Sequence, residues 1–310
     1  MSKPKVAVVG AGQVGGSTAQ SLIQKELADV VLIDVVPGLP QGKALDLSQA
    51  AAVEGWDCKV TGSNDYKDLA GAAIVVVTAG IARKPGMSRD DLLNTNAKIV
   101  GEACESIVKH APGAIVVVVT NPLDVMTALA HKVTGFGDRR VFGMAGVLDQ
   151  GRMRCFLAEA LGVSVKDVVT LVLGSHGDSM VPVASGCNVA GVSVLDLMPR
   201  DRYEKIAQRT RDGGAEIVQL LKQGSAFYAP AASIVQMVAS VLRDEGRVLP
   251  CCVRLNGQYG LRDVFIGVPA KLGARGVEQI IELHLSNDDL AALQKSAAHV
   301  KEQVSKLALS

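Results

Sequence analysis

The sequence has few aromatic side chains and no excess of charge of either sign. Only 3% of its 310 residues are aromatic, and 32 basic side chains stand against 31 acidic ones, which gives a net charge of +1. A protein that binds nucleic acid needs a positive footprint for the phosphates, so we expect no nucleic-acid partner. A hydrophobic fraction of 48% makes disorder improbable as well. The chain is therefore expected to fold into a packed globular protein.

Long hydrophobic runs and paired cysteine motifs are also missing. The apolar runs at residues 72–77 and 114–119 have the length of strands and not of membrane helices. Glycines appear within ten residues of Met1, which leaves no space for a secretory signal peptide. The six cysteines form no C-x-x-C pair and no metal-ligand spacing with histidine, so we expect reduced core thiols and no metal. These absences predict a cytoplasmic protein without a membrane partner.

Strand-like and helix-like segments alternate through the first half of the chain. Short apolar runs are found at residues 5–9, 30–33, 74–77, 114–119 and 140–142, with helical patterns between them, including 89–110 and 123–133. This alternation is typical of a parallel sheet covered by helices on both faces, with right-handed crossovers. The first half therefore predicts a doubly wound α/β domain, which we place at residues 1–145.

The pattern changes in the second half, for which we expect an α+β domain at residues 146–310. Helices are predicted at residues 146–161, 201–222 and 230–242, and strands at 168–173, 264–268 and 277–285. A capping-box pattern that begins at Ser286 precedes a C-terminal amphipathic helix. Two domains also agree with a length of about 150 residues for each.

A glycine-rich segment follows the first expected strand and opens a helix. It has the G-x-G-x-x-G spacing and reads Gly10, Ala11, Gly12, Gln13, Val14, Gly15. The first glycine permits the turn, the second lets a pyrophosphate touch the backbone, and the third lets helix and strand pack closely. Asp34 ends the second strand, where its carboxylate can bind a ribose 2′-hydroxyl and repel a 2′-phosphate. The pattern predicts a Rossmann domain that binds NAD in preference to NADP.

Two other interpretations of this segment remain open. The glycines could form only a tight turn, with Asp34 as a local cap. Methyltransferases that use S-adenosylmethionine also place an acid after a glycine-rich turn. The agreement of strand, turn, helix and acid favours the dinucleotide.

His176 is the candidate for proton transfer, because it lies in a polar turn just beyond an apolar strand. A histidine exchanges protons near neutral pH. Asp149 and Arg152 lie three positions apart at the start of a predicted helix and therefore share a face, where the acid could fix the imidazole tautomer. The alternative is a surface histidine next to an ordinary solvated ion pair.

Arg83 and Arg89 flank a Pro/Gly loop that leads into a helix with a capping box at Ser88. Asn96 lies two helical turns beyond Arg89 and faces the same way. Three arginines near one histidine would suit a substrate with two carboxylates, because guanidinium groups bind carboxylates through two hydrogen bonds. The alternative is that Arg83 only decorates an exposed loop.

Five motifs in this order resemble the lactate/malate dehydrogenase superfamily over nearly the whole chain. They are the glycine-rich segment and residues 83–89, 119–122, 148–152 and 174–178. Arg83 makes the chain similar to the malate dehydrogenases of the lactate-dehydrogenase-like group, because lactate dehydrogenases usually carry a neutral glutamine there. The resemblance implies a Rossmann domain followed by a catalytic α+β domain, with NAD as cofactor and malate or oxaloacetate as the dicarboxylate substrate.

The resemblance also implies a role for each site residue. His176 would accept the proton of the malate hydroxyl, and Asp149 would stabilise the resulting imidazolium. Arg152 would bind the carboxylate next to the reacting carbon, Arg89 would polarise the carbonyl oxygen of oxaloacetate, and Arg83 would bind the distal carboxylate.

The remaining implied contacts involve the cofactor and the assembly. Asn121 would touch both substrate and nicotinamide, and Val119, Thr120 and Asn96 would line the cofactor site. The family forms homodimers or homotetramers, and the apolar segment 234–242 could lie in such an interface. The alternatives are a lactate or broader 2-hydroxyacid dehydrogenase, and a dinucleotide-binding protein without catalytic activity.

Overall fold

The structure, a computed structural model, describes residues 3–81 and 88–307. Within these residues the largest sheet has nine strands in the order β14-β13-β12-β6-β5-β4-β1-β2-β3. Six of them are parallel neighbours: β1 (Lys5–Val9), β2 (Asp29–Ile33), β3 (Val60–Ser63), β4 (Ile74–Val77), β5 (Ile115–Val118) and β6 (Val141–Met144). Their order, 3-2-1-4-5-6, is that of a doubly wound dinucleotide-binding sheet, which confirms the predicted fold class.

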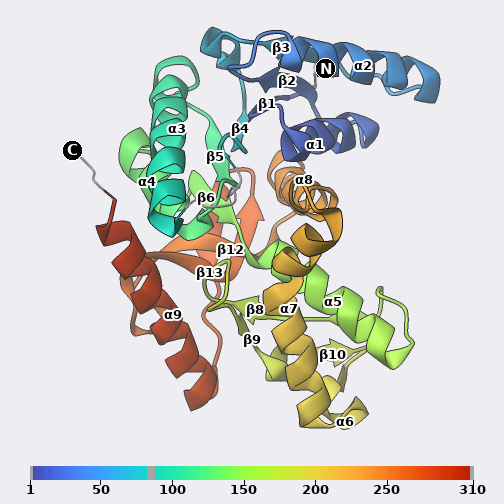
Figure 1. Ribbon diagram of the computed structural model, residues 1–310, viewed down its shortest axis with the longest axis vertical. Helices are drawn as coiled ribbons and strands as arrows, with labels where there is room; N and C mark the ends of the chain where they lie inside the picture. Colours follow the sequence, from blue (N-terminus) through green and yellow to red (C-terminus); the bar gives the residue numbers. More distant parts are fainter. Residues whose placement is uncertain (1–2, 82–87, 308–310) are drawn as a thin grey trace.

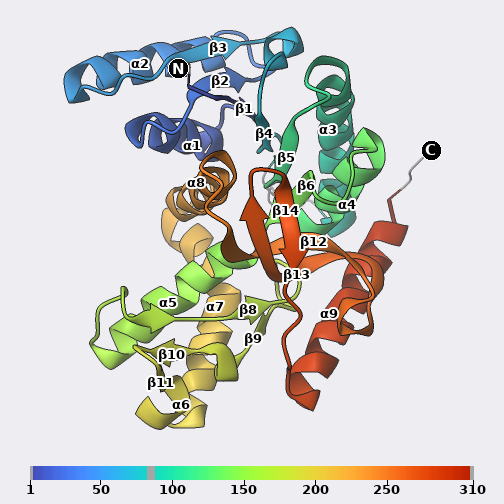
Figure 2. The same ribbon diagram turned by 180° about the vertical axis from the view of Figure 1, so that it is seen from behind.

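Helices cover both faces of the parallel strands (Figures 1 and 2). Val6 and Val8 of β1 point into the core shared with α1 (Gln13–Gln24) and α8 (Tyr228–Leu242). Ala7 and Val9 point into the opposite core, which is shared with α3 (Arg89–His110) and α4 (Leu123–Thr134). Burial on both faces explains why the parallel strands other than the edge strand β3 read as continuous apolar runs. Further along the chain, α2 (Leu39–Glu54) packs beside β3 at one edge of the sheet.

The second half of the chain adds elements below this sheet in Figure 1. They are α5 (Gly146–Leu161), α6 (Val194–Leu197), α7 (Arg200–Leu221), and the short strands β7 (Val168–Val169), β8 (Val172–Leu173), β9 (Val181–Pro182), β10 (Asn188–Val189) and β11 (Val192–Ser193). The prediction of one strand at 168–173 was wrong, because β7 pairs with β10 whereas β8 pairs with β9. The break between these two strands leads the chain from one small sheet to the next.

The C-terminal hairpin completes the large sheet. β12 (Arg247–Asn256) pairs antiparallel with β6, with Cys251 opposite Met144 and Cys252 opposite Gly143. β13 (Arg262–Gly273) and β14 (Gly276–Ile280) follow, so the strand predicted to run to residue 285 ends at Ile280. β12 was not predicted from the sequence, because Pro250 interrupts its apolar pattern and proline argues against a central strand. Pro250 stands opposite Pro269, so two residues without an amide proton share one position of the ladder.

α9 (Asn287–Ser305) closes the fold and lies along β13, with Ser286 as its N-cap (Figure 1). The Ser286 hydroxyl accepts a hydrogen bond from the amide of Asp289, as the capping pattern predicts. Among the described residues, no helix is long and apolar enough to cross a membrane.

Two expectations about apolar and thiol side chains need correction. All six cysteines are free, but Cys155 is exposed and Cys58 is only half-buried, so not every thiol is a core residue. Cys155 occupies a solvent-facing position of α5. The apolar side chains of segment 234–242 pack into the core between α8 and α1, so they are not available for an interface between subunits.

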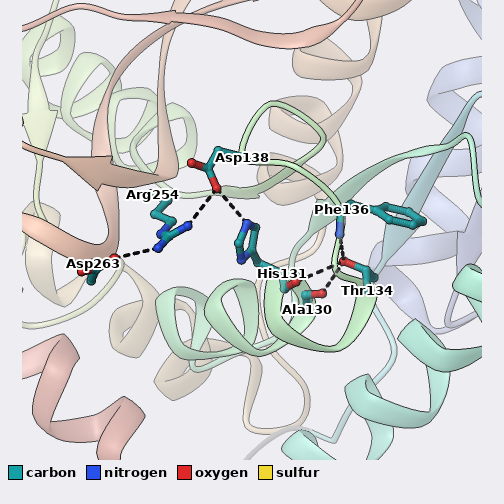
Figure 3. A network of polar contacts seen from close by, with 7 residues as sticks. All are labelled: Ala130, His131, Thr134, Phe136, Asp138, Arg254 and Asp263. Carbon is teal, nitrogen blue, oxygen red and sulfur yellow. Dashed lines mark hydrogen bonds and ion pairs between the residues drawn. The ribbon is translucent and has the colours of Figure 1, made fainter.

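A polar network joins the end of α4 to the C-terminal hairpin (Figure 3). The Oδ1 atom of Asp138 lies 2.8 Å from Nε2 of His131 and accepts a hydrogen bond from Arg254 at 3.3 Å. Arg254 also donates to Asp263 at 2.7 Å, and this contact raises the pKa of Arg254. The His131 ring packs against Phe265, with 5.2 Å between the ring centroids. These contacts join the two halves of the chain, because His131 and Asp138 belong to the first half and Arg254 and Asp263 to the second.

Candidate active site

The glycine-rich turn between β1 and α1 has space for a phosphate group. Gly10 has a φ of +103°, and a Cβ atom there would lie 2.7 Å from the amide nitrogen of Ala79. A Cβ atom at Gly15 would overlap the carbonyl oxygen of Gly10. At Gly12, by contrast, no described atom lies within 4 Å of the Cβ position, and no side chain caps α1. Open space beside uncapped amide groups fits the pyrophosphate of a dinucleotide.

Asp34 fixes the backbone of this turn through hydrogen bonds. Its two carboxylate oxygens accept hydrogen bonds from the amides of Ala11, at 2.7 Å, and Val36, at 3.0 Å. A carboxylate has about four lone-pair sites, so Asp34 retains acceptor capacity for ribose hydroxyls.

Two side chains that were not predicted from the sequence also fix the turn. The Lys43 ammonium group donates to the carbonyl oxygen of Gly12 at 2.9 Å, and the Thr78 hydroxyl donates to that of Gly10 at 2.9 Å. Thr78 directly follows β4, and the carboxyl ends of parallel strands meet at one edge of a sheet, so its position could have indicated this role. Lys43 carries no comparable signal, because its place depends on how α2 packs.

Asn96 connects the two loops that follow β4 and β5. Its side chain is buried, accepts a hydrogen bond from the amide of Ile81 at 2.8 Å and donates to the carbonyl oxygen of Asn121 at 2.7 Å. The Thr120 hydroxyl donates to the carbonyl oxygen of Ala79 at 2.6 Å, next to the buried Val119. The polar atoms of Asn96 therefore bind the backbone of both loops. Asn96 would act on a ligand by fixing the position of these loops.

Asp149 brings His176 and Arg152 together. Its Oδ2 atom lies 3.0 Å from Nδ1 of His176, and its Oδ1 atom accepts a hydrogen bond from Arg152 at 3.4 Å. Asp149 is 2% exposed, His176 11% and Arg152 13%. An ionised carboxylate only accepts hydrogen bonds, so the Nδ1 atom of His176 carries a proton and Nε2 is left for a substrate. Burial lowers the pKa of His176, but the charge and hydrogen bond of Asp149 raise it, and the net direction is upward.

Arg152 occupies a space that two helical glycines provide. A Cβ atom at Gly213 would lie 3.1 Å from Cδ of Arg152, and one at Gly214 would lie 3.6 Å from its Nη2. Burial lowers the pKa of Arg152, while Asp149 opposes this shift. The buried Nε atom has no hydrogen-bond partner among the described residues, so the guanidinium group can still bind an anion. A Gly-Gly pair inside a long helix is the signal that could have revealed this packing.

The backbone of the histidine loop is held from two further helices. The amide of His176 donates to Oδ2 of Asp124 in α4 at 2.9 Å, and the amide of Ser175 donates to Ser296 in α9 at 3.0 Å. A cavity of about 860 Å³ opens in front of this loop and is lined by Asn121 and His176 among others. Asp124 and Ser296 were not predicted from the sequence, because both lie in helices far from residue 176 in the chain.

Two further arginines were predicted for the site, Arg83 and Arg89. Arg83 lies outside the described residues. Arg89 is the first residue of α3, where the predicted capping box between Ser88 and Asp91 is confirmed. The grouping of three guanidinium groups around His176 therefore stays a prediction for these two arginines.

Comparison with known families supports the resemblance that the motifs predict. The lactate/malate dehydrogenase NAD-binding domain matches residues 4–143, and the alpha/beta C-terminal domain of the same family matches residues 146–309. The malate dehydrogenase of Desulforudis audaxviator is 53% identical over 301 residues, or 97% of each chain. That of Methanosarcina mazei is 51% identical and covers 98% of this chain and 99% of its own.

Solved structures of both branches of this family are also similar. Cryptosporidium parvum malate dehydrogenase matches with a TM-score of 0.96 and 42% identity, covering 98% of this chain and 99% of its own. The lactate dehydrogenase of the same organism, in complex with lactic acid and NAD, matches with a TM-score of 0.96 and 39% identity, covering 100% and 99%. The backbone therefore does not separate the two substrates, and the side chains of the site must do so.

Proposed function

The chain belongs to the lactate/malate dehydrogenase family, and from this premise we propose that it interconverts malate and oxaloacetate with NAD as cofactor. When bound, NAD⁺ supplies the acceptor for the hydride of malate. The arrangement of His176 and Arg152 on the Asp149 carboxylate carries the proposal, because it places a proton acceptor beside a guanidinium group. The sequence identity of 51–53% to malate dehydrogenases, over nearly the whole chain, supports the same substrate.

Each residue of the site has a task in this proposal. The Nε2 atom of His176 accepts the hydroxyl proton of malate, and Asp149 stabilises the imidazolium that results. Arg152 binds the carboxylate beside the reacting carbon through its free edge. Asn121, on the wall of the cavity, orients the reacting oxygen and the nicotinamide.

Two tasks fall to the loop arginines. Arg89 polarises the carbonyl oxygen of oxaloacetate, and Arg83 binds the distal carboxylate. Arg83 is then the residue that distinguishes a dicarboxylate from lactate or pyruvate, because a neutral side chain would leave the second carboxylate without a counter-charge.

The preference for NAD over NADP follows from Asp34. Its carboxylate already accepts two backbone hydrogen bonds and stands where the adenosine ribose is bound in this fold. A 2′-phosphate there would place two negative groups in contact.

A substrate panel tests this function. NADH and NADPH are each offered with oxaloacetate and with pyruvate, and we expect the highest kcat/KM for oxaloacetate with NADH. A preference for pyruvate would favour the alternative of a lactate or broader 2-hydroxyacid dehydrogenase. Binding of NADH without turnover of either oxoacid would favour a dinucleotide-binding protein without catalytic activity.

The Arg83→Gln variant tests the assigned substrate charge. We expect it to lower kcat/KM for oxaloacetate by roughly 30-fold to a few thousand-fold, which corresponds to about 2–5 kcal/mol. The kcat/KM for pyruvate should change far less. Equal losses on both oxoacids would show that Arg83 does not recognise the distal carboxylate.

We further propose a cytoplasmic homodimer or homotetramer. Six free cysteines are typical of a reducing compartment. Exposed apolar side chains on α2, Leu45 at 62% and Val53 at 85%, are candidates for contact with another subunit. Sedimentation velocity across a concentration series measures the assembly, and a monomer at all concentrations would contradict it.

A further inference from the structure

A second carboxylate lies behind the histidine loop and has no place in the mechanism above. Asp124 is in the first turn of α4 and is 4% exposed. Its Oδ2 atom accepts the hydrogen bond from the backbone amide of His176 at 2.9 Å. Its Oδ1 atom is buried and has no hydrogen-bond partner among residues 3–81 and 88–307. The thiol of Cys252, on β12, lies near this carboxylate and lowers the pKa of Asp124.

A carboxylate is an unusual choice for this position. A neutral acceptor would bind the same amide, whereas an ionised carboxylate without a counter-charge is costly to bury. Arg152, whose guanidinium group the structure describes at this site, is paired with Asp149. The imidazole of His176 is the group next to Asp124 that gains a positive charge during the reaction. The cost of the buried charge is therefore offset when His176 is protonated.

We propose that Asp124 is a positioning residue for His176, which fixes the backbone of the histidine loop and whose buried negative charge sustains the protonated imidazole. The proposal rests on the assigned role of His176 in malate oxidation. His176 then lies between two carboxylates, with Asp149 at its ring and Asp124 at its backbone. The two come from different halves of the chain, so the proton acceptor is held where those halves meet.

The charged and titratable groups around these two residues set the direction of the expected effect. Asp124 faces His176, Asp149 and the Cys252 thiol. Asp124 and His176 both line the outer cavity, whose wall also carries the charged or titratable residues Asp90, Asp178, Arg211, Lys295, His299 and Lys306. Burial is the largest influence on the pKa of His176, followed by Asp149, Arg152 and Asp124.

Burial raises the pKa of Asp124 to about 6, although hydrogen bonds from the His176 amide and the Cys252 thiol lower it. Asp124 and His176 interact electrostatically, so the charge on each depends on the charge of the other. The ionised form of Asp124 raises the pKa of His176. An uncharged residue at position 124 should therefore lower it.

The Asp124→Asn variant separates charge from shape, because an amide oxygen can still accept the His176 amide hydrogen. The imidazole of His176 is titrated by NMR in the protein labelled with ¹⁵N-histidine, without substrate. We expect its pKa to fall by about one unit, the typical spread caused by protein environments. The acid limb of kcat/KM for malate oxidation should move to lower pH by the same amount, and the alkaline limb for oxaloacetate reduction should follow it.

Ser296→Ala is the matched control for a purely structural effect. It removes the acceptor of the neighbouring Ser175 amide and changes no charge. We expect a lower kcat, because the loop is held less firmly, and an unchanged pKa of His176. If Asp124→Asn gives the same result as Ser296→Ala, the proposal is overturned.

A pair of variants at Cys252 keeps the test decisive even if Asp124→Asn does not fold. Cys252→Ser supplies a stronger donor to Asp124 and should raise the pKa of His176, whereas Cys252→Ala removes the donor and should lower it. Shifts of opposite sign support the proposal, and shifts of the same sign or none overturn it. The NMR titration needs no turnover, so an enzyme that fails to oxidise malate would refute the proposed function and leave this result standing.

Discussion

At the scale of single residues, the site depends on one carboxylate that serves two cations. Asp149 uses Oδ2 for His176 and Oδ1 for Arg152, and it is almost completely buried. Burial strengthens both interactions, because few water molecules screen them. A change at Asp149 should therefore affect proton transfer and carboxylate binding together.

The Asp149→Asn variant should lower kcat/KM for malate by roughly 10² to 10⁴-fold, the usual range for general acid–base catalysis. The Asp149 carboxylate raises the pKa of His176, so its loss lowers that pKa and moves the acid limb of the pH profile to lower pH. Steady-state kinetics between pH 5 and 9 measure both effects.

Asp138→Asn is the matched control, because Asp138 pairs with His131 at 2.8 Å on the partly exposed side of α4 (Figure 3). We expect this variant to leave the pH profile unchanged. An unchanged profile in Asp149→Asn would contradict the role assigned to Asp149.

Some contacts between the site residues could be predicted from the sequence, and others could not. Asp149 and Arg152 lie on one helix face, so their proximity follows from helical geometry alone. The contact between Asp149 and His176 was one of two interpretations of these residues and was also implied by the family resemblance, whereas Asp124 and Ser296 were not predicted. Their contacts with the histidine loop depend on the packing of α4 and α9, which local sequence patterns do not encode.

At the scale of elements, the glycines of the turn before α1 meet two different requirements, which are close packing of the backbone and space for a phosphate group. Gly15 is needed for packing, because a Cβ atom there would overlap the Gly10 carbonyl oxygen. Gly12 faces open space, and its φ of −67° suits any residue. The two glycines should therefore differ in what their substitution damages.

We expect Gly15→Ala to reduce the free energy of unfolding by about 3 kcal/mol or more, since backbone atoms must move. Gly12→Ala should keep its melting temperature but raise the Kd of NADH by about tenfold or more, because its methyl group occupies the phosphate space. Thermal denaturation followed by circular dichroism measures the first quantity, and quenching of protein fluorescence by NADH measures the second.

Gly101→Ala provides the control for adding a methyl group. Gly101 lies inside α3 with no described atom within 4 Å of its Cβ position, so this variant should be slightly stabilised and bind NADH normally. Normal NADH binding by Gly12→Ala would exclude Gly12 from the phosphate site.

The predictability of the elements follows their patterns. Five of the six parallel strands were predicted closely because they are apolar and buried, and the end of α5 was predicted closely because Gly162 follows it. The edge strand β3 was not predicted, because only Val60 in it is buried. β12 was missed because of Pro250, and the split of residues 168–173 depends on partners distant in the chain. Pairing between distant strands is a property of the tertiary structure.

At the scale of the whole molecule, one sheet runs through both halves of the chain. β12 pairs with β6, and side chains from β12 enter the core that also receives β1 and α1. The division of the chain into two domains between residues 145 and 146 stays a prediction. Because one sheet is continuous through both parts, we expect the two parts to unfold together.

Urea unfolding tests this cooperativity, because the single tryptophan, Trp56, lies in the first half. Trp56 packs against the shared core, so its fluorescence should follow the same transition as far-UV circular dichroism of the whole chain. Val253→Ala, a core change in β12, should lower the unfolding free energy seen by both probes by roughly 2 kcal/mol. Val248→Ala, at a 54% exposed position of the same strand, should lower neither. A tryptophan transition that stays in place in Val253→Ala while circular dichroism shifts would mean that the two halves unfold independently.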